Sequence, residues 1–178
     1  MAAAGWMTTK SGTVYVERGK GGSARREGAN MREASAEDLP VVFFPEGTTS
    51  DGTGLLKFHS GLLAEALGSD QPVTAGCLSY SLNGGESSGA RVAEDVAYWG
   101  DMSLPIHIFR FLGVRGVVAH VRIAEKPIRF SEGAVSRKAA AVEARCAVLE
   151  LRRQQATGVE GALVQRDEEC DALLQRGR

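Results

Sequence analysis

The sequence predicts an α/β fold, a mostly parallel β-sheet flanked by helices, with a helical C-terminus. Short β-rich segments bounded by turn residues recur along the chain. The run Pro40 to Phe44 is continuously apolar, as in a strand that is buried on both faces of a parallel sheet. Segments with helical periodicity alternate with these strands, which is the order found in a βαβ unit. At 178 residues, the chain is long enough for one domain with a hydrophobic core.

The first part of the chain contains a predicted strand, helix and strand. Residues Gly12 to Glu17 alternate in character and are β-rich, so we expect a strand. Residues Glu27 to Leu39 are predicted to form a short helix, although Gly28 lowers the helix propensity. The apolar strand Pro40 to Phe44 follows directly.

Apolar periodicity predicts the elements that follow the turn-rich segment Gly47 to Gly54. Residues Leu55 to Leu67 form a predicted helix, and Gly68 ends it. The later elements are strands at Pro72 to Leu82 and Gly116 to Ala124, an apolar helix or helix pair from about Trp99 to Leu112, an Ala-rich helix from Ser136 to about Arg153, and a weakly anchored helix within Gln154 to Arg178.

Composition excludes several classes of protein. The formal net charge of -1 and the 6% aromatic content provide neither an electrostatic nor a stacking surface for nucleic acid. Cys77, Cys146 and Cys170 form no C-x-x-C pair, so we expect no disulfide framework or zinc knuckle, and a reducing compartment. Residues Met1 to Lys10 lack the pattern of a signal peptide. No stretch has the roughly 20 apolar residues that span a bilayer, so we expect a soluble or peripheral protein.

The most informative segment is Phe43 to Ser50, with the sequence FFPEGTTS. A predicted strand ends there in a Pro-Glu-Gly turn that a cluster of hydroxyl residues follows. Gly47 permits the turn, and the hydroxyl and free N–H groups can then bind an anionic or polar headgroup. In open α/β sheets, ligands bind at the carboxyl ends of the strands, where this loop is predicted to lie. An ordinary turn at the end of a strand is the alternative.

Two segments resemble signature blocks of the lysophospholipid acyltransferase family, of the 1-acylglycerol-3-phosphate acyltransferase type. The family's block F-P-E-G-T-R-S is matched at Phe44, Pro45, Glu46, Gly47, Thr48 and Ser50. Thr49 stands where arginine is usual. Gly12 to Arg18, GTVYVER, is similar to the family's G-x-I-F-I-D-R block. The resemblance covers roughly Gly12 to Pro127 and implies a glycerolipid acyltransferase-like fold.

The resemblance also implies an activity in phospholipid biosynthesis. A fatty acyl group moves from acyl-CoA or acyl carrier protein to the hydroxyl of a lysophospholipid such as 1-acylglycerol-3-phosphate, without a metal or prosthetic group. The residues implied to bind the acceptor are Arg18, Glu46, Gly47, Thr48 and Ser50. Arginine's planar fork suits a phosphate at Arg18. Because a carboxylate repels a phosphate, Glu46 is expected to hold Arg18 or backbone N–H groups in place.

Two other functions stay open. The loss of the guanidinium at Thr49 weakens the case for lysophosphatidic acid, and the form FPEGTTSDG resembles bacterial members that act on lyso-ornithine lipid. The second alternative is a non-catalytic module that binds lipid headgroups on the same fold.

The family's catalytic motif, His-x-x-x-x-Asp, does not precede Gly12. In that motif the histidine is the general base and the aspartate orients it. The histidines present, His59, His107 and His120, have no aspartate at this spacing, and His120 has only Glu125. We therefore assign no catalytic residue, expect His120 to be an ordinary sheet histidine, and expect no histidine–carboxylate pair in the site. His59 could contact the acceptor headgroup or be an ordinary first-turn helix residue.

The missing motif has two explanations, an N-terminally truncated enzyme, which we prefer, or a catalytically inactive relative. We divide the chain into an acyltransferase domain, residues 1–132, and a C-terminal helical segment and tail, residues 133–178. The family's lipid substrates imply a peripheral protein on the cytoplasmic face of a membrane. The apolar cluster between Met102 and Leu112 could face lipid, but its uniform character favours burial in the core. We also expect Arg18 and the Glu46 to Ser50 loop to meet in one cleft.

Overall fold

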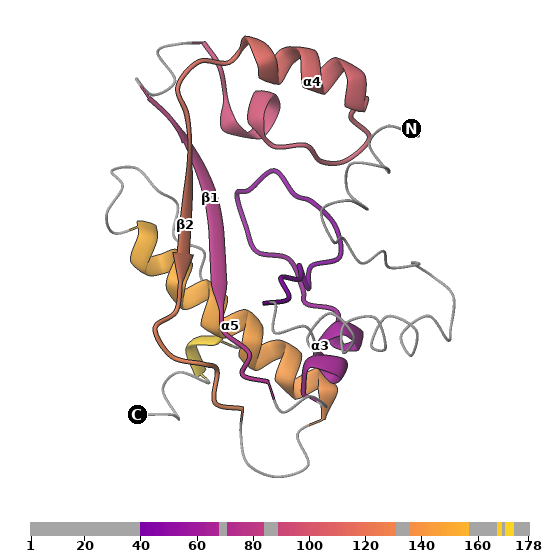
Figure 1. Ribbon diagram of the computed structural model, residues 1–178, viewed down its shortest axis with the longest axis vertical. Helices are drawn as coiled ribbons and strands as arrows, with labels where there is room; N and C mark the ends of the chain where they lie inside the picture. The colour runs from indigo at the N-terminus through magenta and orange to yellow at the C-terminus, as the bar shows by residue number, and fades with distance from the viewer. Residues whose placement is uncertain are drawn as a thin grey trace.

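The computed structural model describes residues 40–67, 71–83, 89–130, 136–156, 167–168 and 170–172 (Figure 1). Its elements are α3 (Ser60–Leu67), β1 (Gly76–Leu82), the π-helical turn η2 (Val92–Val96), α4 (Leu104–Gly113), β2 (Val117–Ile123) and α5 (Arg137–Ala156). In Figure 1 the two strands form a long ladder, with α4 at one end and α5 with α3 at the other. The predicted strand Gly12 to Glu17, the predicted helix Glu27 to Leu39 and Arg18 lie outside the described residues.

The sheet of the described chain has two strands, β1 and β2, and they run antiparallel. Both strands lie where the sequence predicts them, but the prediction of a parallel arrangement is wrong for this pair. The N–H of Asn83 donates to the carbonyl of Gly116 at 2.7 Å, so the connection through η2 and α4 leaves and returns at the same end of the ladder. Gly116 has a φ of +73°, and a side chain there would clash with Asn83. A strand–helix–strand order therefore does not prove a parallel crossover.

The apolar run Pro40 to Phe44 is not a strand buried on both faces, as the sequence predicted. It is irregular, and no described strand pairs with it. The side chains of Val42 and Phe44 are 78% and 69% exposed, whereas Phe43 packs beside Leu63. Only Val41 and Phe43 of this run are half-buried, and the other residues are exposed, so continuous hydrophobicity did not lead to burial on both sides.

Helix α5 is the centre of the described core. The helix lies where the sequence predicted it, and the hydroxyl of Ser136 accepts the N–H of Ala139 at 3.2 Å and caps its start. Three apolar clusters surround α5: one with α3 around Leu63, Ala141 and Ala144, one with β1 around Ala75, Cys77 and Leu151, and one around Cys146, Leu149 and Cys170. The small alanine side chains allow these neighbours to approach the helix closely. The division of the chain at residue 132 stays a prediction.

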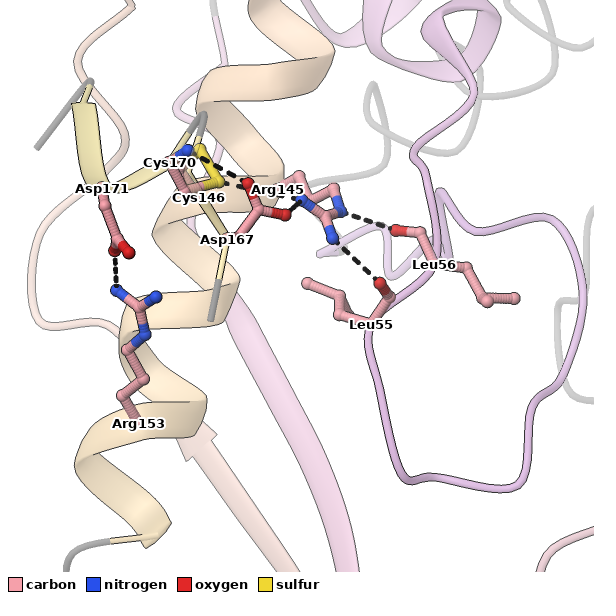
Figure 2. The surroundings of a disulfide bond; sticks show 8 residues. All are labelled: Leu55, Leu56, Arg145, Cys146, Arg153, Asp167, Cys170 and Asp171. Carbon is pink, nitrogen blue, oxygen red and sulfur yellow. Dashed lines mark hydrogen bonds and ion pairs between the residues drawn. A yellow bond between two sulfur atoms is a disulfide. The ribbon is translucent and has the colours of Figure 1, made fainter. Parts of the chain in front are cut away.

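A disulfide joins Cys146 of α5 to Cys170 (Figure 2). The expectation of no disulfide framework is therefore wrong for these two cysteines. They are 24 residues apart, but the C-terminal segment lies against α5, and the two Cα atoms are 5.1 Å apart. Cys77 is free and buried, and burial raises the pKa of its thiol.

The apolar helix α4 is exposed along much of its length, and the expectation that it is buried in the core is wrong. Ile106, Phe109 and Leu112 are 63%, 78% and 73% exposed. Only His107 is buried among the residues of α4, with the rings of Tyr98 and Phe111 beside it. Among the described helices and strands, the main contact of α4 is with η2. Among the helices described, none combines the length and apolar character that crossing a bilayer requires.

Candidate functional site

The segment from Phe44 to His59, called here the 44–59 loop, is closed by two backbone hydrogen bonds. The N–H of Gly47 donates to the carbonyl of Phe44 at 3.1 Å and forms the turn after the apolar run. The N–H of His59 donates to the carbonyl of Pro45 at 2.7 Å and brings the end of the loop back to its start. The motif residues therefore lie in one compact loop.

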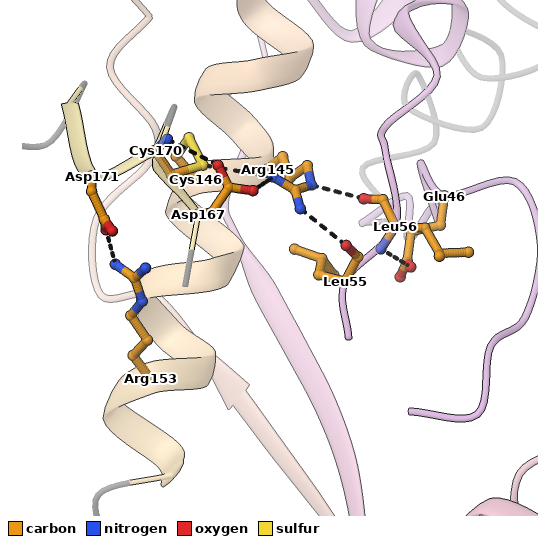
Figure 3. A network of polar contacts seen from close by, with 9 residues as sticks. All are labelled: Glu46, Leu55, Leu56, Arg145, Cys146, Arg153, Asp167, Cys170 and Asp171. Atoms are coloured by element: carbon orange, nitrogen blue, oxygen red, sulfur yellow. Dashed lines mark hydrogen bonds and ion pairs between the residues drawn. A yellow bond between two sulfur atoms is a disulfide. The ribbon is translucent and has the colours of Figure 1, made fainter. Parts of the chain in front are cut away.

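Glu46 fixes the interior of this loop through its side chain. Its Oε2 atom accepts the N–H of Leu56 at 2.8 Å (Figure 3). The sequence predicted that Glu46 holds Arg18 or backbone N–H groups, and the structure shows the second of these arrangements. A hydrogen bond to a charged group contributes about 1.5–3 kcal/mol, so this contact is a substantial restraint on a ten-residue span.

Gly47 lies directly against the imidazole of His59. Its φ of +67° is in the left-handed region that favours glycine. A Cβ atom at this position would lie 2.8 Å from Cδ2 of His59. The ring occupies the space that a side chain would need, and His59 is exposed to solvent. His59 is therefore adjacent to the motif residues, as one of its two sequence interpretations requires.

The hydroxyl residues of the loop differ in their surroundings. Thr48 and Thr49 are exposed, whereas Ser50 accepts the N–H of Gly52 through its Oγ at 3.4 Å. Asp51 accepts both the N–H and the hydroxyl of Thr53, at 3.0 and 2.8 Å, and these bonds lower the pKa of its carboxyl group. Thr48 thus offers a hydroxyl to solvent, while Ser50 and Asp51 stabilise the far turn of the loop.

Two arginines of α5 bind backbone carbonyls of the 44–59 loop, and sequence reasoning missed both. Arg145 donates through Nε to the carbonyl of Leu56 at 2.9 Å and through a terminal nitrogen to that of Leu55 at 3.0 Å. Arg152 donates to the carbonyl of Gly52. The two arginines lie two helical turns apart on the same side of α5, and this spacing is the one signal in the sequence that could have indicated them.

These contacts also correct the predicted start of the helix at Leu55. Helix α3 begins at Ser60 instead. The N–H of Leu56 is bound to Glu46, and the carbonyls of Leu55 and Leu56 are bound to Arg145, so these groups are not available for a helical ladder. Tertiary hydrogen bonds override the local periodicity here.

The histidines form no catalytic pair within the part of the chain that the structure describes. His120 pairs with Ser79 across the sheet and shares a 2.7 Å hydrogen bond with the hydroxyl of Ser81, so it is the sheet histidine that the sequence predicted. His107 is buried, and its Nδ1 has no hydrogen-bond partner among these residues. None of the histidines in the described ranges hydrogen-bonds a carboxylate. No group of three or more metal-ligating side chains occurs there either.

Comparison with known proteins shows the family of the chain. A family model described as Acyltransferase matches residues 1–78, which include Arg18 and the 44–59 loop. The chain is 36% identical over 123 residues to a lyso-ornithine lipid O-acyltransferase of Pseudomonas aeruginosa, covering 68% of this chain and 45% of that protein. This chain belongs to the lysophospholipid acyltransferase family.

Two further relatives of the chain carry related names. A 1-acyl-sn-glycerol-3-phosphate acyltransferase of Neisseria meningitidis is 31% identical over 121 residues, which are 66% of this chain and 44% of that protein. A lyso-ornithine lipid O-acyltransferase of Rhodobacter capsulatus is 28% identical over 135 residues, which are 72% of this chain and 46% of that protein. The chain thus spans less than half the length of these three relatives. No solved structure matches it significantly.

Proposed function

We propose that this protein transfers a fatty acyl group from acyl-CoA or acyl carrier protein to a hydroxyl of a lysophospholipid. The acceptor oxygen forms a bond to the thioester carbonyl carbon, the carbon–sulfur bond breaks, and a general base removes the hydroxyl proton as the donor thiol is released. The observation that carries the proposal is the 44–59 loop. Its family motif is folded so that Glu46 is engaged with the backbone and Thr48 is open to solvent.

In this proposal the loop is the acceptor-binding element. Gly47 allows the turn that exposes neighbouring N–H groups, and Thr48 adds a hydroxyl donor. Ser50 completes the set of acceptor-binding residues. We propose that Arg18 binds the acceptor phosphate from a neighbouring strand of a larger, mostly parallel sheet, as in the resemblance described above. The reaction needs no metal or prosthetic group, because binding, orientation and proton transfer suffice.

Lyso-ornithine lipid is the second candidate acceptor, and two features of the loop favour it. Thr49 stands where the family usually has an arginine, so one cation for a phosphate is missing. Asp51 adds a carboxylate with a lowered pKa to the same loop. A negative charge here disfavours a phosphate dianion and suits a headgroup that carries an ammonium group.

We propose that the protein binds the cytoplasmic face of a membrane through α4. The helix presents large exposed apolar side chains, Ile106, Phe109 and Leu112, to solvent. Arg110 and Arg115 are exposed beside them and can contact anionic headgroups. Apolar residues inserted at the interface, together with basic residues, are typical of a peripheral surface.

The decisive experiment is an acyl-transfer assay with labelled acyl-CoA and two acceptors, lysophosphatidic acid and lyso-ornithine lipid. The 178 residues contain no His-x-x-x-x-Asp motif, so we expect no transfer above background from this chain. Losing a general base costs about 10²–10⁴ in rate. Joined behind an N-terminal segment that carries the motif, the same residues should transfer acyl groups.

Three outcomes would change the proposal. Turnover by the 178 residues alone would show that the base lies within them. No turnover by the joined protein, with headgroup binding retained, would favour the non-catalytic binding module. In the joined protein, Arg18→Ala should mainly raise the KM for the acceptor, and an unchanged KM would remove Arg18 from the site.

A further inference from the structure

The position of the 44–59 loop depends on a side chain that lies far away in the sequence. Leu56 is held on both sides, since its N–H donates to Glu46 and its carbonyl accepts from Arg145 (Figure 3). Arg145 also binds the carbonyl of Leu55. The motif carboxylate and the α5 guanidinium therefore act on the same peptide segment from opposite sides.

Arg145 is itself held in place by the C-terminal segment. Its guanidinium forms an ion pair with Asp167, and the two side chains are only 13% and 17% exposed. Asp167 also accepts the N–H of Cys170 at 3.1 Å, and the disulfide ties Cys170 to Cys146, the neighbour of Arg145 (Figure 2). The carboxylate that orients the guanidinium is thus on a segment covalently tethered to α5.

The geometry requires an arginine. Separate nitrogens of one guanidinium donate to the carbonyls of Leu55 and Leu56 and to Asp167. A guanidinium presents five N–H donors in a planar fork, whereas a lysine ammonium is a single point from which these directions cannot all be reached. Because the group is largely withdrawn from water, losing it would remove one hydrogen-bond or ion-pair partner from each of these carbonyls and from the carboxylate.

We propose that Arg145 is the positioning residue of the acceptor-binding loop, held for this task by Asp167 and the tethered C-terminal segment. This inference rests on the proposed function, because only that function makes the 44–59 loop an acceptor-binding element. Arg145 acts through Leu56 on Glu46, and Glu46 directly precedes Gly47 and Thr48, whose groups face the proposed acceptor. Its role is therefore indirect, and its loss should loosen the loop more than the core.

The test is hydrogen exchange on the full 178-residue chain, read at the amide of Leu56. Arg145→Ala should accelerate exchange at Leu56 about tenfold or more, as expected when a charge-assisted contact is lost. Arg145→Lys should give an intermediate rate. The amide of Leu149, buried in the core, reports global opening and should change less.

Arg153→Ala is the matched control. Arg153 lies on the same helix and forms an ion pair with Asp171 of the same segment at 2.6 Å (Figure 2). It should leave the exchange rate at Leu56 within about twofold, since its ion-pair partner Asp171 lies outside the 44–59 loop. If Arg145→Ala and Arg153→Ala accelerate Leu56 equally, or if Leu149 accelerates as much as Leu56, the role of Arg145 is merely structural and the proposal is wrong.

A double-mutant cycle tests the connection through Leu56. Glu46→Ala and Arg145→Ala act on one peptide segment, so their effects on exchange at Leu56 should be less than additive, while Glu46→Ala and Arg153→Ala should add. If the effects of Glu46→Ala and Arg145→Ala on exchange at Leu56 are additive, the two side chains are not coupled through Leu56 and this part of the proposal is wrong.

Binding of short-chain lysophosphatidic acid and lyso-ornithine lipid to the same chain separates the two proposals. Accelerated exchange in Arg145→Ala, with no acceptor binding by the unsubstituted chain, overturns the proposed function alone. Acceptor binding with unchanged exchange overturns the positioning role alone. Binding by the unsubstituted chain that falls at least about tenfold in Arg145→Ala, but not in Arg153→Ala, supports both.

Discussion

Substituting Gly47 by alanine should destabilise the protein about twice as much as the same change at Gly52. Both glycines have a left-handed backbone, with φ of +67° and +81°, so alanine costs about 1 kcal/mol at either position. Only at Gly47 would the new Cβ meet a neighbour, Cδ2 of His59 at 2.8 Å, whereas nothing lies within 4 Å at Gly52. Forcing the imidazole away from its rotamer costs about 1 kcal/mol more. The expected losses in free energy of unfolding are thus about 2 and about 1 kcal/mol.

Urea unfolding of the two variants measures this difference, and His59→Ala supplies the control. With the imidazole removed, the cost of Gly47→Ala should fall to that of Gly52→Ala, because the clash no longer exists. Equal costs at the two glycines in the presence of His59 would refute the reasoning. A larger cost at Gly47 that persists in the His59→Ala background would show that the strain has another source.

Two further predictions concern the C-terminal disulfide and α4. Cys170→Ser should lower the free energy of unfolding by about 3 kcal/mol, since the bridge closes a loop across a separation of 24 residues. Equal urea midpoints for the variant and the unsubstituted chain would contradict it. Phe109→Glu should reduce sedimentation with phosphatidylglycerol vesicles about tenfold, while Val121→Glu, at a similarly exposed residue of β2, should not. Equal losses would show that α4 is not the lipid-binding surface.

The sequence correctly predicted the strands and the helix that depend mainly on interactions between neighbouring residues. The β-rich segments around Gly76 and Val117 became β1 and β2, and the Ala-rich run after Ser136 became α5. Backbone propensity and a capping hydroxyl act between neighbours in the chain, so a local pattern contains the necessary information. The turn at Gly47 likewise forms where the sequence predicted it.

Contacts between distant residues decided what the sequence could not predict. The antiparallel pairing depends on where the connection returns, at Asn83 and Gly116. The predicted helical turn at Leu55 was lost because Arg145 binds its carbonyl from 90 residues away. The exposure of α4 depends on which surfaces are left to cover it, and hydrophobicity alone does not contain that information.

The long sequence separations around the 44–59 loop also determine when it can become ordered. Arg145 follows Leu55 by 90 residues, and Arg152 follows Gly52 by 100. At a synthesis rate of about 5–20 residues per second, these arginines are synthesised about 5 to 20 seconds after the loop residues that they bind. Contacts at such distances also form late, because closing a long stretch of chain must precede them. The 44–59 loop, near the start of the described chain, is thus completed only after helix α5 has been made.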